Sequence, residues 1–151
     1  MITVNGLDEL KALVGRELGP SSWLEVTQDR VNAFAEATND HQWIHVDVDR
    51  AAQGPFGGTI AHGYLTLSLV IPFFSEILRV EGIKMGVNYG LDKVRFPSPV
   101  RVGSKIRLTA TVDAVEEVAR RCVQMSLTFT VHIDGIDKPA CVAYPIYRYY
   151  A

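Results

Sequence analysis

The chain has 151 residues, about the size of one ordinary domain, and residues 1–151 are interpreted as a single domain. Its composition is 48% hydrophobic and 21% charged, close to the average of globular proteins, which excludes disordered and fibrous classes. Lysine and arginine together number 15 and aspartate and glutamate 17, so the formal net charge is -2. This near balance argues against a nucleic-acid-binding protein, because such proteins need an excess of basic side chains to neutralise phosphates.

The sequence indicates neither a membrane anchor nor a secretory signal. Its longest apolar stretch, residues 64–74, contains Thr66, Ser68 and Pro72 and is shorter than the roughly 20 residues that a membrane span needs. The N-terminal segment carries acidic residues and lacks a basic region followed by an apolar one. The two cysteines are too few for the disulfide framework of a small secreted protein. We therefore expect a cytoplasmic protein that does not bind membranes.

The N-terminal quarter predicts two helices separated by a short strand. Leucine residues recur at helical spacing over residues 7–14, and Gly19-Pro20 ends that pattern. Residues 23–26 resemble a short strand. Thr27 is a suitable N-cap for a second helix over residues 28–38, in which apolar side chains recur at i, i+3, i+4 and i+7.

The middle of the chain combines a polar loop with a very apolar helix. Residues 39–61 are interpreted as mostly loop, with one helical turn at residues 49–53. The segment 64–80 is apolar on nearly every side, which is typical of a helix that other parts of the protein surround. Pro72 lies inside this segment and should kink the helix or divide it in two.

After Gly82 the hydrophobic pattern changes to a period of two. Four segments alternate in this way, namely residues 85–96, 106–113, 122–131 and 141–149. Half-polar alternation predicts an antiparallel sheet with one dry face, and the apolar helix is the obvious element for that face to cover. The predicted fold class is therefore α+β, with a curved antiparallel sheet wrapped around a central apolar helix.

Asp40 and His45 are the most suggestive polar residues of the loop. An aspartate and a histidine close to one water molecule can share proton transfer, one taking a proton while the other orients or donates. In the structural alternative, Asp40 only ends the preceding helix and His45 is an ordinary loop histidine. A metal site is a third option because His41 and His45 are four residues apart, but no further convincing ligand follows. Spacing alone does not decide between the first two interpretations.

Two other candidate sites carry less information. Cys122 and Cys141 lie in strand-like segments, where buried cysteine behaves as a small apolar residue, so cysteine catalysis is not expected. Gly63 directly precedes the apolar helix, where unpaired backbone N–H groups can stabilise a developing oxyanion. Its small size is equally compatible with a close approach between the helix and the strands.

These segments together resemble the MaoC-like dehydratases, also called (R)-specific enoyl-CoA hydratases. The resemblance rests on the pair Asp40-x4-His45 with Asp47, on the sequence IAHG at residues 60–63, and on RFPSPV at residues 95–100. The sequence DHQWIH at residues 40–45 is similar to the nodulation protein N-like branch, with Gln42 and Trp43 in place of the family's common Asn and Pro. The resemblance implies the hot-dog fold and a dimer.

The resemblance also implies an activity, the reversible addition of water to a trans-2-enoyl-CoA to give an (R)-3-hydroxyacyl-CoA. Asp40 and His45 would be the catalytic pair holding one water over C3, and the N–H of Gly63 would stabilise the enolate on the thioester oxygen. No metal or organic cofactor is implied. Residues expected to contact the acyl-CoA thioester are Ile60, Ala61, His62, Gly63, Ser68, Gly86, Val87, Asn88, Tyr89, Arg95, Pro97 and Arg148. Arg101 and Lys105 are further candidates for the CoA phosphates.

Other functions remain open at this point. A hot-dog thioesterase would use a carboxylate on the central helix, where Glu76 is the only acid. A non-catalytic acyl-CoA-binding subunit, or a dehydratase subunit that needs a partner chain, would share the fold, although the presence of both Asp40 and His45 favours the hydratase. Because the predicted sheet has an open edge that the sequence does not blunt, we expect pairing with a second copy in a homodimer.

Overall fold

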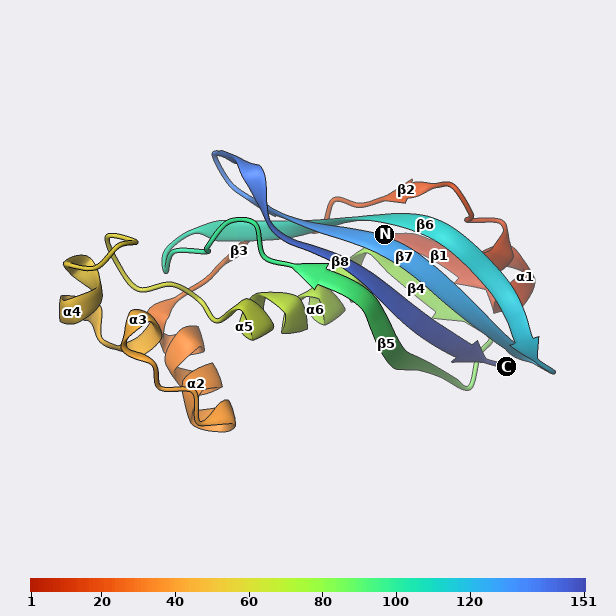
Figure 1. The fold of residues 1–151 in the computed structure, drawn as a ribbon. Helices are drawn as coiled ribbons and strands as arrows, with labels where there is room; N and C mark the ends of the chain where they lie inside the picture. Colours follow the sequence, from red (N-terminus) through yellow and green to blue (C-terminus); the bar gives the residue numbers. More distant parts are fainter.

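The computed structural model describes residues 1–151, and its largest element is a strongly curved antiparallel sheet (Figure 1). The strand order is β2-β6-β7-β8-β5, and β3 also pairs with β6. The strands are β2 (Glu17–Leu18), β3 (Leu24–Glu25), β5 (Met85–Arg95), β6 (Lys105–Ala119), β7 (Cys122–Ile133) and β8 (Ile136–Tyr150). The four long strands include the four alternating segments of the sequence, except that β5 ends at Arg95, one residue before the predicted end, so the predicted antiparallel sheet is confirmed.

The central helix lies across one face of this sheet as two consecutive helices, α5 (Gly63–Ser68) and α6 (Val70–Ile77) (Figure 1). The division falls at Leu69, which ends α5 and begins α6. Pro72 is in the first turn of α6, where a backbone N–H would have no intrahelical partner, so proline costs little there. The prediction that this proline accompanies a division of the helix is confirmed.

The structure differs from the sequence prediction in two segments, the N-terminus and the residues that follow the central helix. The helix expected to reach Val80 ends at Ile77, and β4 (Leu78–Glu81) follows directly. This strand pairs in parallel with β1 (Ile2–Asn5), which the leucine pattern of the N-terminus did not predict. The N-terminal helix α1 (Gly6–Lys11) is correspondingly short. A parallel pair between segments so distant in sequence leaves no local signal, which explains why both strands were missed.

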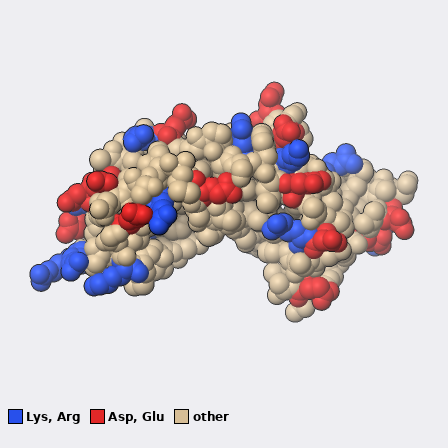
Figure 2. Space-filling view, turned by 180° about the vertical axis from the view of Figure 1, so that it is seen from behind, with Lys and Arg blue, Asp and Glu red and all other residues tan.

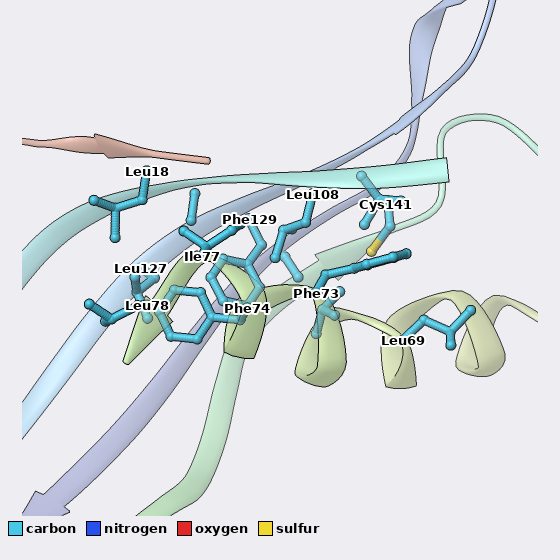
Figure 3. Close-up of a cluster of buried hydrophobic side chains, with 14 of the residues drawn as sticks. Leu18, Leu69, Phe73, Phe74, Ile77, Leu78, Leu108, Leu127, Phe129 and Cys141 are labelled. Carbon is cyan, nitrogen blue, oxygen red and sulfur yellow. The ribbon is translucent and has the colours of Figure 1, made fainter. Parts of the chain in front are cut away.

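The hydrophobic core fills the space between the helices and the sheet (Figure 3). Phe74 of α6 packs against Phe129 of β7 and Tyr147 of β8, with ring centroids 4.9 and 5.7 Å apart. Cys141 lies in this core without solvent exposure, and burial raises the pKa of its thiol to about 11. Because a thiol with so high a pKa is a poor nucleophile at neutral pH, the expected apolar role of this cysteine agrees with its environment.

Three short helices project beyond the end of the sheet, next to the start of α5: α2 (Gln28–Thr38), α3 (Trp43–Val46) and α4 (Val48–Ala52) (Figure 1). The predicted bounds of α2 are confirmed, and the Thr27 hydroxyl accepts a hydrogen bond from Arg30 N at 3.3 Å. Asn39 ends this helix in the left-handed conformation with φ of 59°. The helical turn expected at residues 49–53 corresponds to α4, whereas α3 was not predicted.

The surface is of mixed charge. Figure 2 shows acidic and basic side chains interspersed over one face of the molecule, as expected for a net charge of -2. None of the helices combines the length and apolar character needed to cross a lipid bilayer.

Candidate active site

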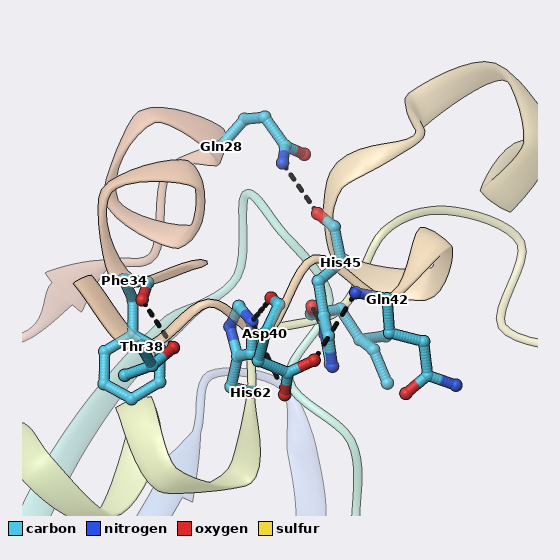
Figure 4. A network of polar contacts seen from close by, with 8 residues as sticks. Gln28, Phe34, Thr38, Asp40, Gln42, His45 and His62 are labelled. Atoms are coloured by element: carbon cyan, nitrogen blue, oxygen red, sulfur yellow. Dashed lines mark hydrogen bonds and ion pairs between the residues drawn. The ribbon is translucent and has the colours of Figure 1, made fainter. Parts of the chain in front are cut away.

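Asp40, His45 and His62 come together where the projecting helices meet the start of α5 (Figure 4). Asp40 follows the end of α2, His45 belongs to α3, and His62 is the N-cap of α5. One side-chain oxygen or nitrogen atom from each lies within 4.8 Å of those of the other two. A single water molecule can bridge polar atoms at such separations, since each of its hydrogen bonds spans almost 3 Å.

His45 is held in one orientation and one tautomer. Its side chain is buried, and its Nδ1 lies 2.6 Å from the carbonyl oxygen of Ile60. Because a carbonyl oxygen only accepts, Nδ1 carries the proton and donates, which leaves Nε2 with a free lone pair. The backbone of His45 is also held, because Gln28 Nε2 donates to its carbonyl oxygen at 2.8 Å (Figure 4).

Burial is the main cause of a lowered pKa at His45, below the ordinary value of 6.5. The neighbouring His62 ring lowers this pKa further, whereas the hydrogen bond to Ile60 and the Asp40 carboxylate partly oppose the shift. A lowered pKa means that the ring stays neutral at neutral pH and into mildly acidic solution. Nε2 is therefore available to accept a proton from water.

The Asp40 carboxylate is the accessible member of the group. Its side chain is 53% exposed, and its Oδ1 accepts only a long contact of 3.4 Å from Gln42 N. Its Oδ2 lies 4.0 Å from Nε2 of His62. Since Asn39 itself provides the left-handed residue that ends α2, the Asp40 side chain is not needed to end that helix. The carboxylate is thus free to bind a water molecule or substrate beside His45.

A cavity of about 350 Å³ opens beside His45. It is lined by His45, Phe56, Ile60, Ala61, Gly63, Thr66, Phe96, Ser98, Pro99, Val100 and Ala140. The lining is mostly apolar, with Thr66 and Ser98 as the two hydroxyl-bearing residues. The predicted catalytic histidine and three predicted contact residues, Ile60, Ala61 and Gly63, thus share one cavity.

The position of Gly63 is compatible with both roles that the sequence left open. It is the first residue of α5, so its N–H has no partner within the helix, and the residue lines the cavity. A Cβ atom at this position would lie 3.1 Å from two ring carbons of Phe96. The close approach of Phe96 explains why a glycine suits this position, and the free N–H is a candidate donor to a ligand.

Comparison with known proteins identifies the family to which this chain belongs and several similar proteins. Residues 9–133 match the family model described as MaoC like domain. The chain belongs to the MaoC-like family. It is 50% identical over 151 residues to 3-hydroxyacyl-thioester dehydratase Z of Mycobacterium tuberculosis (strain ATCC 25618 / H37Rv), covering 100% of both chains. It is 44% identical over 139 residues to Nodulation protein N of Rhizobium meliloti (strain 1021), covering 91% of this chain and 86% of the relative.

A solved structure shows the same fold as this MaoC-like chain. The (R)-hydratase from A. caviae involved in PHA biosynthesis superposes with a TM-score of 0.71 at 23% identity, covering 89% of this chain and 94% of that chain. The family resemblance seen in the sequence, its similarity to nodulation protein N and the α+β hot-dog fold are confirmed.

Several predicted contact residues of the MaoC-like chain lie away from the cavity that contains His45. His62 is only 3% exposed and stacks behind His45 instead of lining the cavity. The Ser68 hydroxyl donates to Tyr64 O at 2.7 Å and borders a separate cavity of about 220 Å³. Gly86 and Asn88 line a third cavity, of about 370 Å³, between α6 and β5.

The remaining predicted contact residues lie on β5, on β8 or at the cavity rim. Val87 and Tyr89 are exposed on β5. Arg148 donates to Gln124 Oε1 and places its guanidinium 3.6 Å from the ring centroid of Tyr89. The exposed Arg95 donates to the carbonyl of its own neighbour Val94. Pro97 is half-buried between Phe96 and Ser98, which line the cavity. The exposed Arg101 donates to Gly57 O at 2.8 Å, and Lys105 is exposed at the start of β6.

The donor atoms of the MaoC-like site suit proton transfer better than metal binding. Nδ1 of His45 and Nε2 of His62 each donate a hydrogen bond to a backbone carbonyl, so neither is available as a ligand. The atoms that remain are the Asp40 carboxylate, His45 Nε2 and the buried, unpaired Nδ1 of His62. Because protein zinc sites use at least three ligands, a zinc ion would need all three of these groups. His41, the other candidate from the sequence, is exposed and has its Nε2 3.7 Å from Glu36.

Sequence reasoning missed the residues that support or extend the site. Gln28 bridges His45 O and the Thr59 hydroxyl, which donates to Gln28 Oε1 at 2.6 Å. At the start of an amphipathic helix Gln28 resembles an ordinary surface residue, so the sequence carries no signal for this role. Thr66 could have been found, because it follows Gly63 at i+3 and therefore shares its helix face.

Proposed function

We propose that this chain catalyses the reversible hydration of a trans-2-enoyl-CoA to an (R)-3-hydroxyacyl-CoA. The observation that carries the proposal is the free Nε2 of a neutral His45, which lies beside the open carboxylate of Asp40 and lines the same cavity as Gly63. The name of the mycobacterial relative, 3-hydroxyacyl-thioester dehydratase Z, supports the same chemistry in the reverse direction.

In this mechanism Asp40 and His45 hold one water molecule over C3 of the substrate. The pair removes a proton from the water as its oxygen bonds to C3, and the same pair supplies a proton to C2. Between these events negative charge develops on the thioester oxygen as an enolate. The N–H of Gly63 donates to that oxygen, a contribution of roughly 3 kcal/mol for a well-placed donor. Dehydration follows the same steps in reverse.

The cavity supports a reacting acyl group of modest size. A volume of about 350 Å³ is at the lower end of small-molecule pockets, so we propose that it encloses the reacting acyl end and leaves the remainder of CoA outside. Phe56, Phe96 and Val100 provide apolar contacts for the acyl carbons. Thr66 is 2% exposed, and its hydroxyl at the cavity wall is a candidate hydrogen-bonding group for the substrate.

The thioesterase alternative is less well supported. Glu76, the only acid of the central helix, accepts hydrogen bonds from the Ser22 hydroxyl at 2.6 Å and from Ser22 N at 3.0 Å. The Ser22 hydroxyl, followed by the backbone N–H, lowers the pKa of Glu76. Glu76 lines none of the three cavities, so it is not placed to attack or activate water against a bound thioester.

The test uses crotonyl-CoA and longer enoyl-CoA substrates, with a thiol reagent present. We expect loss of the conjugated double bond without release of free CoA thiol, because hydration leaves the thioester intact. Chiral analysis of the product should give the (R)-3-hydroxyacyl-CoA. Thiol released in step with substrate loss would instead establish a thioesterase, unchanged substrate a non-catalytic protein, and an (S) product a hydratase of the opposite stereochemistry.

We also propose that the active form is a homodimer formed through β5. This strand is an edge of the sheet, and it exposes four large apolar side chains: Met85, Val87, Tyr89 and Leu91. The cavities of about 370 and 220 Å³ lie between β5 and the central helix, and no layer covers that side of α5 and α6 (Figure 1). A second copy would pair the open edge and cover these apolar residues.

Leu91→Asp is expected to shift the dimer to monomer in sedimentation at micromolar concentration, because it places a charge in the proposed interface. Val118→Asp is the matched control: Val118 is 43% exposed, Leu91 is 41% exposed, and Val118 lies at the far end of β6. We expect this control to remain dimeric. A wild-type chain that is monomeric at this concentration would contradict the proposal and direct attention to a different partner chain.

A further inference from the structure

His62 lies at the point where three segments of the site meet. It is the N-cap of α5, is only 3% exposed, and packs between two rings. On one side the His45 ring is stacked with its centroid 3.9 Å away and an interplanar angle of 23°. On the other side lies the ring of Phe34, with its centroid 4.9 Å away. The next residue along the chain is Gly63, at the cavity wall.

The polar edge of the ring is used for a single contact. Nε2 lies 2.9 Å from the backbone carbonyl oxygen of Asp40, and it donates because that oxygen only accepts (Figure 4). Nδ1 is buried and has no hydrogen-bond partner. Burying an unpaired nitrogen is unfavourable, and a phenylalanine would fill the same space without that cost. The histidine is therefore explained by its Nε2–H bond to Asp40 and not by packing alone.

We propose that His62 is a positioning residue that fixes Asp40 relative to His45. The hydrogen bond anchors the backbone of Asp40 from the start of α5, and the stacked ring limits the movement of His45. The His62 side chain thereby contacts the end of α2 and helix α3, and its backbone directly precedes the N–H of Gly63. His62 does not line the cavity with the substrate, so it acts through its neighbours. This inference rests on the proposed hydratase activity.

The kinetic test compares His62→Phe with the wild type. Phenylalanine keeps a ring between Phe34 and His45 but removes the donor to Asp40. We expect kcat for crotonyl-CoA hydration to fall about 10- to 100-fold, as for displacement of a catalytic group by about 1 Å, with KM changed less than about threefold. The melting temperature should not fall, because the unpaired Nδ1 is removed as well. His41→Phe, an exposed histidine of the same segment, is the control and should keep wild-type kcat.

The dependence on Asp40 is tested in the Asp40→Asn background. If His62 acts by positioning that carboxylate, adding His62→Phe to Asp40→Asn should reduce the residual rate by less than about threefold. An unchanged kcat in the single variant would overturn the proposal. The same fold loss in both backgrounds would overturn it too, because His62 would then act independently of Asp40.

A measurement on the wild type covers the case in which the variant does not fold. Nitrogen NMR of the imidazole rings should show a proton on Nε2 in His62 and on Nδ1 in His45. A His62 ring whose Nε2 carries no proton could not donate to the Asp40 carbonyl, and this result would overturn the proposal. Absence of wild-type hydration would instead refute the proposed function, and the tautomer measurement would still decide whether His62 holds Asp40.

Discussion

Asp40→Asn is expected to lower kcat for enoyl-CoA hydration by about 100- to 10,000-fold, the range of a lost general acid or base. The amide has nearly the same shape as the carboxylate but cannot take up or deliver the proton. Its oxygen can keep the single contact with Gln42 N, and the side chain is largely exposed. We therefore expect the free energy of unfolding to change by less than about 0.5 kcal/mol.

The measurement pairs steady-state kinetics with a chemical unfolding curve of the same preparation. Asp49→Asn, an exposed aspartate in α4, is the matched control and should retain wild-type turnover. A variant at Asp40 with near wild-type kcat would remove this residue from the mechanism. It would also restore the interpretation in which the aspartate belongs only to the loop after α2.

His45→Gln is expected to reduce kcat by a similar factor, about 100- to 10,000-fold, because no lone pair of comparable basicity remains beside Asp40. Unlike Asp40, His45 is buried, donates to Ile60 O and stacks on His62. We expect the variant to fold but to lose about 1–3 kcal/mol of stability through imperfect replacement of these contacts. Kinetics and urea unfolding separate the two effects.

His132→Gln provides the control for this second variant. His132 is a half-buried histidine of β7 whose Nε2 lies 2.8 Å from the Thr109 hydroxyl, outside the site. Its replacement should lower stability and leave kcat unchanged. Loss of turnover in proportion to stability in both variants would show that His45 has only a structural role.

The local hydrophobic pattern was sufficient to predict those helices and strands whose formation depends mainly on residues within the same segment. The period of α2 and the Thr27 cap predicted its bounds, and alternation predicted the four long strands. The β1–β4 pair was missed because parallel pairing joins segments that share no local pattern. Gly86 and Asn88 were expected along the substrate, but they border the cavity between α6 and β5, because strand order decides which cavity a strand faces.

The sequence by itself determined the chemical types at the site, an aspartate and a histidine five residues apart in the loop that precedes an apolar helix. Only the tertiary structure decided what those side chains can do. The tautomer of His45 depends on the carbonyl of Ile60, 15 residues further along the chain, and Asp40 is anchored by His62, 22 residues away. These partners meet because residues 59–61 pair with residues 100–102 and hold the start of α5 against the projecting helices. Proton location follows from such contacts between distant segments, and spacing along the chain does not encode them.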